Sequence, residues 1–205
     1  TQRVEICKKT NEIRDSLDQK WIDLASKLKL LPIILPNTNK KNISKLFLKH
    51  TPDIIILTGG NDIHIKNSIK TINISKKRDD FEIALIKYAI KKSVPLLGVC
   101  RGMQIINIFF KGKISQIKDH VNKKHKIYYS EKYDNYFTNT VNSFHNWGIK
   151  KKDLSTQLNE IAVDQSGNIE SFVHKNKSII GIMWHPERRN NKKDLLIFKK
   201  LINKK

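Results

Sequence analysis

Cysteine is scarce in this chain of 205 residues, which contains only Cys7 and Cys100. Two cysteines cannot form the disulfide framework on which small secreted domains depend, so a reducing cytoplasm is the expected location. Long apolar runs are lacking too: none approaches the roughly 20 residues of a membrane helix. The N-terminal stretch has no apolar core like that of a signal peptide. We therefore expect a cytoplasmic protein that does not use a membrane.

Acidic residues are also few: 19 Asp and Glu oppose 40 Lys and Arg, which gives a net charge of +21. Such an excess attracts polyanions such as nucleic acids, anionic membranes or nucleotides. The lysines are scattered in pairs, as at Lys40-Lys41 and Lys91-Lys92, rather than gathered in one run. This spacing favours a solvated surface over a nucleic-acid groove. A nucleic-acid partner is not expected, and the charge favours an anionic small-molecule substrate over a cationic one.

Glycine is rare, and its positions are informative, because four of the eight glycines lie in the two loops 59–60 and 98–102. In the second loop an apolar run ends in Gly-x-Cys-x-Gly around Cys100, and an apolar, helix-like segment follows over 103–110. This is the strand–turn–helix layout that holds a nucleophile on a strained elbow above a parallel sheet. At a helix N-terminus the dipole favours thiolate over thiol. The alternative is a buried core cysteine between two glycines.

A base for this thiol is found near the C-terminus, where the apolar run 179–183 ends in Trp184-His185-Pro186-Glu187. Cysteine catalysis needs a base to take the thiol proton and a third group to orient that base. On an extended backbone, which Pro186 favours, the side chains of His185 and Glu187 project to the same side. By itself the tripeptide is more typical of a solvated loop. Together with the elbow it predicts a Cys100–His185–Glu187 triad.

The other glycine loop suggests an oxyanion hole. A predicted buried strand, 53–57, runs directly into Thr58-Gly59-Gly60-Asn61. Backbone N–H groups at such a turn can point at a developing oxyanion. We pair the N–H of Gly60 with that of Arg101, the residue after the nucleophile. An ordinary Gly-Gly turn is the alternative.

Periodicity predicts alternating helices and strands in the first half of the chain. The expected elements there are helix 13–28, strand 31–35, helix 43–48, strand 53–57, a helix from about Ser75, and the elbow strand with its helix. Short β segments then follow, at 126–129, 138–143, 161–164 and 169–174, with the last two forming a hairpin, before a closing amphipathic helix over 194–202. This order indicates an α/β fold in one domain, 1–205: a flavodoxin-like, mostly parallel sheet flanked by helices, with a smaller antiparallel β region.

These features resemble the class I glutamine amidotransferase-like proteins, in the branch of γ-glutamyl-γ-aminobutyrate hydrolase (peptidase family C26). Six motifs carry the resemblance in the family's order: Thr1–Arg3, Leu57–Asp62, Arg78–Glu82, Gly98–Gln104, Val141–His145 and Trp184–Glu187. In that family an apolar strand precedes the first motif, so the sheet either lacks that strand or the strand lies before Thr1. The sequence also departs from the family at Asn146-Trp147-Gly148, on the expected leaving-group side.

The resemblance implies roles for residues that spacing alone does not identify. It makes Cys100 the nucleophile of a γ-glutamyl amide hydrolase and assigns substrate contacts to six residues: Gly59, Asn61, Gln104, Ser143, Phe144 and His145. Apart from the resemblance, we expect Arg78, Asp79 and Glu82 to form an ion-pair cluster at a helix start that supports the Gly59-Gly60 loop; a merely charged first turn is the alternative.

We expect a small-molecule γ-glutamyl substrate, with an anionic nucleotide conjugate favoured, and no cofactor. His120 and His125 stand among lysines at an irregular spacing, so no metal site is expected. The alternatives are a γ-glutamyl-γ-aminobutyrate hydrolase, a glutaminase subunit that delivers ammonia to a separate synthetase, and a non-catalytic nucleic-acid-binding protein. A homodimer is left open.

Overall fold

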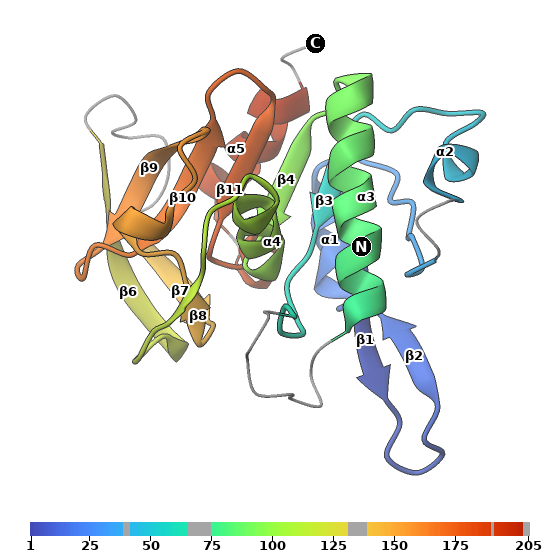
Figure 1. The fold of residues 1–205 in the computed structure, drawn as a ribbon, viewed down its shortest axis with the longest axis horizontal. Helices are drawn as coiled ribbons and strands as arrows, with labels where there is room; N and C mark the ends of the chain where they lie inside the picture. The colour runs from blue at the N-terminus through green and yellow to red at the C-terminus, as the bar shows by residue number, and fades with distance from the viewer. Residues whose placement is uncertain (39–41, 65–74, 131–138, 190, 203–205) are drawn as a thin grey trace.

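A seven-stranded mixed sheet forms the centre of the molecule (Figure 1). The structure, a computed structural model, describes all residues except 39–41, 65–74, 131–138, 190 and 203–205. In spatial order the strands are β3 (Ile55–Leu57), β4 (Leu96–Val99), β11 (Ile179–Ile182), β10 (Ile169–His174), β9 (Leu158–Asp164), β6 (Val121–Tyr129) and β7 (Thr140–Phe144).

The sheet has a parallel part and an antiparallel part. β3, β4 and β11 pair in parallel, and all later pairings, from β11–β10 to β6–β7, are antiparallel. Among the described strands the parallel part is therefore narrower than the alternating sequence pattern suggests, and the predicted antiparallel region continues the same sheet. The expected α/β class and the hairpin of β9 and β10 are confirmed.

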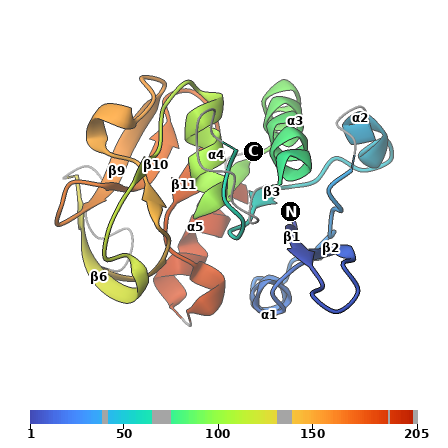
Figure 2. The same ribbon diagram turned by 60° about the horizontal axis from the view of Figure 1, so that its bottom comes forward.

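Two layers of helices cover the sheet, as Figure 2 shows most clearly. α3 (Lys76–Lys92) and α4 (Arg101–Phe109) lie on one face, and α1 (Lys20–Lys27) and α5 (Lys192–Ile202) lie on the other. Alternate residues of β4 serve the two faces: Leu96 belongs to the core beneath α3 and α4, whereas Leu97 packs in the core with α1 and α5. This alternation follows from the two-residue period of a strand.

The prediction for the N-terminal region is wrong in two places. Residues 13–16 form β2 (Ile13–Ser16), which pairs with β1 (Arg3–Ile6) in a projecting hairpin, so the helix begins only at Lys20. Ile13, taken as part of a buried helical stripe, is 75% exposed. The run 31–35 is not a strand; Pro32 within it and Pro36 after it lack the N–H that a ladder needs.

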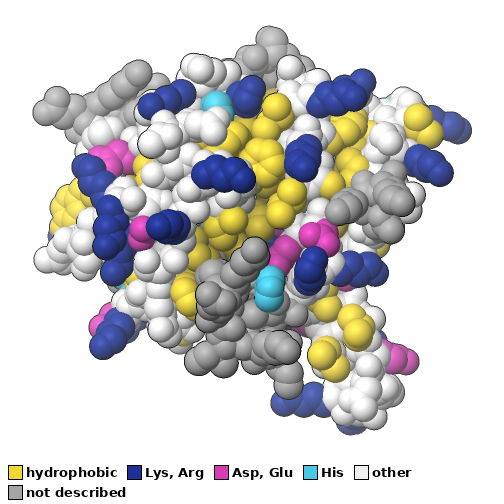
Figure 3. Space-filling model, in the orientation of Figure 1, with side chains coloured by type: hydrophobic (Ala, Val, Ile, Leu, Met, Phe, Trp, Pro, Cys, Tyr) yellow, Lys and Arg dark blue, Asp and Glu magenta, His cyan; other side chains and the backbone are white. Residues whose placement is uncertain are grey.

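The remaining elements are short. They are α2 (Ile43–Leu46), β5 (Ser115–Gln116), β8 (Trp147–Gly148) and the 3₁₀ turns η3 (Lys151–Asp153) and η4 (Pro186–Arg188). Among the described residues, no helix combines the length and the apolar character needed to cross a membrane. On the face seen in Figure 3, Lys and Arg side chains are spread out singly and in small groups between patches of other types.

Candidate active site

Cys100 lies on a sharp turn between β4 and α4 at the carboxyl edge of the parallel strands. Its backbone has φ 51° and ψ −106°, a combination that is strained for any residue with a Cβ. The turn is held on both sides: the Cys100 N–H donates to Ile182 O at 2.8 Å, and the Cys100 carbonyl accepts from Gln104 N–H at 3.1 Å. The predicted strand–turn–helix elbow is confirmed as geometry.

Glycines make this turn possible, because they have no side chain where the backbone of α4 meets those of β4 and β3. A Cβ on Gly98 would lie 2.5 Å from the carbonyl oxygen of Gly102. A Cβ on Gly102 would overlap the carbonyl oxygen of Leu57 in β3. α4 therefore approaches the sheet more closely than any residue with a side chain would allow at these two positions.

His185 and Glu187 stand beside Cys100. His185 follows β11, the neighbour of β4, and its Nδ1 is 2.7 Å from Oε1 of Glu187. Asn142 of β7 fixes the backbone of His185 through two hydrogen bonds: it accepts from the His185 N–H at 2.9 Å and donates to the His185 carbonyl at 3.1 Å. The structure thus brings the three residues of the predicted triad together at the carboxyl ends of two neighbouring strands.

The route by which Glu187 reaches His185 differs from the prediction. The chain is extended at His185, with φ −106° and ψ 94°, but Pro186 then begins the 3₁₀ turn η4. Proline suits the first position of a helical turn, because its fixed φ is helical and its missing N–H is not needed there. Glu187 therefore folds back onto the imidazole instead of projecting beside it from an extended strand.

The imidazole of His185 is almost fully buried, at 3% exposure. Burial works against its charged form, but the negative charge of Cys100 and hydrogen bonds with Cys100 and Glu187 outweigh burial and raise the pKa of His185 to about 9. A raised pKa means that the proton stays on the ring at neutral pH. The protonated imidazole thus lies between the sulfur of Cys100 and a carboxyl oxygen of Glu187.

Arg78 orients the Gly59-Gly60 loop. Its guanidinium donates to the carbonyl oxygens of Thr58 at 2.8 Å, Gly59 at 3.0 Å and Gly60 at 2.9 Å. Because the C=O and N–H of a trans peptide point in opposite directions, the N–H of Gly60, which shares a peptide unit with the Gly59 carbonyl, points away from Arg78. A Cβ on Gly59 would lie 2.6 Å from Cε1 of His185, which places the loop directly against the imidazole.

A buried ion-pair network anchors Arg78 and the residue after the nucleophile. Arg78 Nε is 3.0 Å from Glu82, and the guanidinium of Arg101 pairs with both Glu82 and Asp79. Burial disfavours the charged form of Glu82, yet Arg101 and Arg78 outweigh it and lower the pKa of this carboxyl to about 2. The predicted supporting cluster near the glycine loop is confirmed.

The six residues expected to contact substrate divide into two groups. Gly59 lines a small hollow of about 40 Å³ with His185 and Glu187, and Phe144 lines a larger pocket next to it. The polar side chains of the other four already bind backbone groups: Asn61 pairs with Val4, Gln104 and His145 with the Trp147 carbonyl, and Ser143 with the His120 carbonyl. None of these four lines either cavity, and their contact with substrate stays a prediction.

Three histidines, His120, His125 and His145, form a cluster with the carboxyl groups of Glu170 and Asp164. Ligand atoms of His120, His125 and Glu170 lie within 4.8 Å of one another, and Nε2 of His145 is 3.9 Å from Glu170. Both ring nitrogens of His120 already face acceptors, the Lys118 carbonyl at 2.7 Å and Asp164 at 2.8 Å. His120 therefore has no ring nitrogen left to ligate a metal in this arrangement.

Comparisons with known proteins agree with this geometry. The family model of peptidase C26 matches residues 2–187. The chain belongs to the peptidase C26 family. Within it, the chain is 36% identical over 201 residues to the γ-glutamyl-CDP-amidate hydrolase of Campylobacter jejuni, covering 97% of this chain and 94% of that protein. It is 33% identical over 194 residues to a putative glutamine amidotransferase-like protein of Lactococcus lactis, covering 82% and 79%.

Among solved structures, a protein of Thermoplasma acidophilum described as a putative GMP synthase subunit matches with a TM-score of 0.68 at 22% identity, covering 90% of this chain and 85% of that one. At this identity the likeness concerns the fold, which is that of the class I glutamine amidotransferase-like proteins. Family membership and the Campylobacter relative together support a hydrolase that acts on a γ-glutamyl amide.

Sequence reasoning missed several residues around the site. Asn142 lies inside the motif Val141–His145, but the sequence assigned it no role. Arg188 directly follows Glu187, and this position is a signal that could have identified it. Glu170 gave no signal, because only the antiparallel pairing of β10 brings it to the histidines.

Proposed function

We propose that this chain hydrolyses the γ-glutamyl amide bond of a small anionic conjugate through a thioester on Cys100, and releases glutamate. The observation that carries the proposal is the meeting of Cys100, His185 and Glu187 at a strained elbow beside the Gly59-Gly60 loop. A buried imidazole with a raised pKa, hydrogen-bonded to a thiol on one side and a carboxylate on the other, is the arrangement that cysteine acyl transfer needs.

In the first half-reaction the thiolate sulfur of Cys100 attacks the γ-carbonyl carbon, and the C=O electron pair moves onto oxygen. The backbone N–H groups of Gly60 and Arg101 are the proposed donors to this oxyanion. When the tetrahedral intermediate collapses, the C–N bond breaks and the leaving nitrogen takes the proton of His185. A γ-glutamyl thioester remains on the enzyme.

In the second half-reaction neutral His185 removes a proton from water, and the resulting hydroxide attacks the thioester carbonyl. The C–S bond breaks, glutamate leaves, and the thiolate–imidazolium pair is restored. Glu187 keeps the ring in one orientation and stabilises its charged form throughout, as the 2.7 Å contact to Nδ1 allows.

The substrate we favour is a γ-glutamyl nucleotide amidate. The name of the Campylobacter relative supports it, since that protein acts on γ-glutamyl-CDP-amidate and the two chains align over almost their whole lengths. The net charge of +21 agrees with an anionic substrate. A place in the biosynthesis of capsule phosphoramidate follows from this choice.

Glutamate release from a panel of γ-glutamyl compounds tests the proposal. The panel contains glutamine, γ-glutamyl-γ-aminobutyrate, γ-glutamyl-putrescine and γ-glutamyl-CDP-amidate. Cys100→Ala should abolish turnover of every substrate while thermal unfolding stays within a few degrees of the wild type, because only one sulfur is lost. Activity of Cys100→Ala near that of the wild type would remove Cys100 as the nucleophile.

A strong preference for one conjugate would define the leaving group of a free-standing hydrolase. Release of ammonia from glutamine only after a synthetase is added would instead make the chain a glutaminase subunit.

A further inference from the structure

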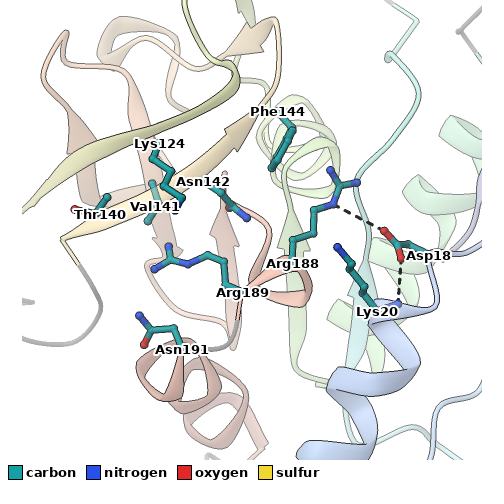
Figure 4. A pocket seen from close by; sticks show the side chains of 10 residues that line it. All are labelled: Asp18, Lys20, Lys124, Thr140, Val141, Asn142, Phe144, Arg188, Arg189 and Asn191. Carbon is teal, nitrogen blue, oxygen red and sulfur yellow. Dashed lines mark hydrogen bonds and ion pairs between the residues drawn. The ribbon is translucent and has the colours of Figure 1, made fainter.

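A pocket of about 900 Å³ opens beside the candidate triad (Figure 4). Its walls come from separate parts of the chain: β6 and β7 on one side, η4 and the segment before α5 below, and the start of α1 opposite. It shares Asp18 and Arg188 with the small hollow that His185 and Glu187 line, so the two cavities adjoin.

Positive charge gathers in this pocket. Lys20, Lys124, Arg188 and Arg189 line it together with one acidic residue, Asp18. Outside the lining, Arg189 pairs with Asp194 at 3.4 Å. Arg188 lies 3.9 Å from Asp18, and neither lysine forms an ion pair with another described residue. Across the surface in Figure 3 basic side chains are dispersed, whereas here four of them, from three separate segments of the chain, line one cavity.

Phe144 and Arg188 connect the pocket to the reacting groups. The ring of Phe144 meets the imidazole of His185 edge-on at 5.7 Å between centroids, and the guanidinium of Arg188 lies 4.7 Å from the centre of the same ring. Arg188 is also 3.6 Å from Glu187. A group held by Arg188 is therefore one aromatic ring away from the base.

The chemistry of amide cleavage indicates which part of the substrate lies in this pocket. His185 gives its proton to the leaving nitrogen, so whatever is attached to that nitrogen must extend from His185 into the adjoining cavity. The small hollow, at about 40 Å³, cannot hold a bulky leaving group, and the basic pocket can.

We infer that the basic pocket binds the leaving group of the substrate, and that this group carries phosphate. This inference rests on the proposed function. Several cations on separate elements suit the spread charge of a phosphate or diphosphate, and Arg188 offers the planar fork that binds phosphate oxygens in pairs. Ammonia, the leaving group of glutamine, carries no phosphate and is too small to fill this pocket.

A matched pair of substrates tests the inference: γ-glutamyl-ethanolamine and γ-glutamyl-O-phosphoethanolamine have the same amide and differ only in one phosphate. We expect the wild type to prefer the phosphorylated compound by at least about tenfold in kcat/KM. Lys124→Ala and Arg188→Ala should each reduce that preference by about tenfold. Lys124 is exposed and outside the buried core, so its removal tests charge without disturbing the triad.

Lys177→Ala is the control, because this exposed lysine in the β10–β11 turn is outside the pocket lining. It should leave the preference unchanged. Equal turnover of both substrates by the wild type, or a preference that survives in both pocket variants, would overturn the inference while leaving the hydrolase intact.

Binding of inorganic diphosphate to Cys100→Ala, measured by calorimetry, separates the two proposals. If neither these two amides nor any compound of the γ-glutamyl panel is cleaved, the proposed function fails. Diphosphate binding that weakens about tenfold on adding Lys124→Ala, but not Lys177→Ala, still supports an anion site. Binding that is insensitive to both changes would contradict the site itself.

Discussion

Although burial favours the neutral ring, interactions with Cys100 and Glu187 keep His185 protonated. Its pKa, raised to about 9 from an ordinary 6.5, means that the ring loses its proton only as the pH rises through about 9. The stabilisation that the proton gives to the fold is complete below the ordinary value and is lost over the same rise. We therefore expect glutamate release to decline above about pH 9, because the leaving nitrogen then finds no proton.

Glu187→Gln should move that decline to lower pH. The amide keeps the size of the side chain but removes the charge that, with its hydrogen bond, helps to hold the proton on His185. Turnover at neutral pH should fall by roughly 10²-fold or more, since the ring also loses its orienting partner. The measurement is kcat/KM against pH for both proteins; an unchanged alkaline limb would show that Glu187 does not act on His185.

Glu82 shows how a charge can be buried when its partners are fixed. Its carboxyl has a pKa lowered to about 2, so its contribution to stability is present above the ordinary value of 4.5 and is lost as the pH falls through about 2. Glu82→Gln leaves Arg101 and Arg78 without their shared carboxylate and should destabilise the fold by about 3–5 kcal/mol at pH 7.

Chemical denaturation at pH 7 and at acid pH checks this. The variant should lose less stability than the wild type between about pH 4.5 and 2. Asp80→Asn is the control: it removes a carboxylate from the same helix, but one that is half exposed and pairs only loosely, at 3.5 Å, with Lys76. It should change stability by less than about 1 kcal/mol.

At the level of elements, the contact of α4 with β3 depends on Gly102. A methyl group there would overlap the carbonyl oxygen of Leu57, so Gly102→Ala forces the helix away from the sheet and displaces the elbow. We expect a loss of about 2–4 kcal/mol in unfolding free energy, together with a large loss of activity. Gly167→Ala has open space around the new methyl group and suffers only from φ +78°, so it should cost about 1 kcal/mol and leave activity intact.

The elements that could be predicted from the sequence are those in which the apolar residues of the pattern are the ones that the structure buries. The elbow strand, its helix and the helix capped by Ser75 meet this condition. The helix expected over 13–28 is confirmed only over Lys20–Lys27, because the spacing of Ile13 and Leu17 continued a helical period by chance while pairing with β1 decided the backbone of 13–16. Such pairing lies outside the three- and four-residue spacings of a helical period, so periodicity cannot detect it.

For the whole molecule, the net charge of +21 acts against compactness through self-repulsion. Salt screens this repulsion within a Debye length of about 10 Å at 0.1 M. We expect the thermal midpoint to rise when NaCl is increased from low to physiological concentration. Replacing Lys91 and Lys92 by Gln should reduce the rise; a midpoint that falls with salt would mean that attractive ion pairs dominate the surface.

The proximity of Cys100 to His185 could be predicted from the sequence, whereas the pocket beside them could not. Cys100 and His185 lie in short, local motifs that end parallel strands, and parallel strands place their carboxyl ends at one edge. Lys20, Lys124 and Arg188 lie in three distant segments whose meeting depends on how the antiparallel strands and α1 pack against that edge. The sequence alone does not distinguish these two lysines from the many others that are scattered along the chain.

Different strands of the sheet carry different parts of the candidate site. β4 leads to Cys100, the proposed nucleophile, and β11 leads to His185, the proposed base. The antiparallel strands β6 and β7 supply one wall of the basic pocket. Since β11, β10 and β9 separate these two strands from β4, a pocket residue that does not touch His185, such as Lys124, can be exchanged without moving Cys100. Proteins with this sheet could therefore diverge in the leaving group that they bind while Cys100 and His185 keep their positions.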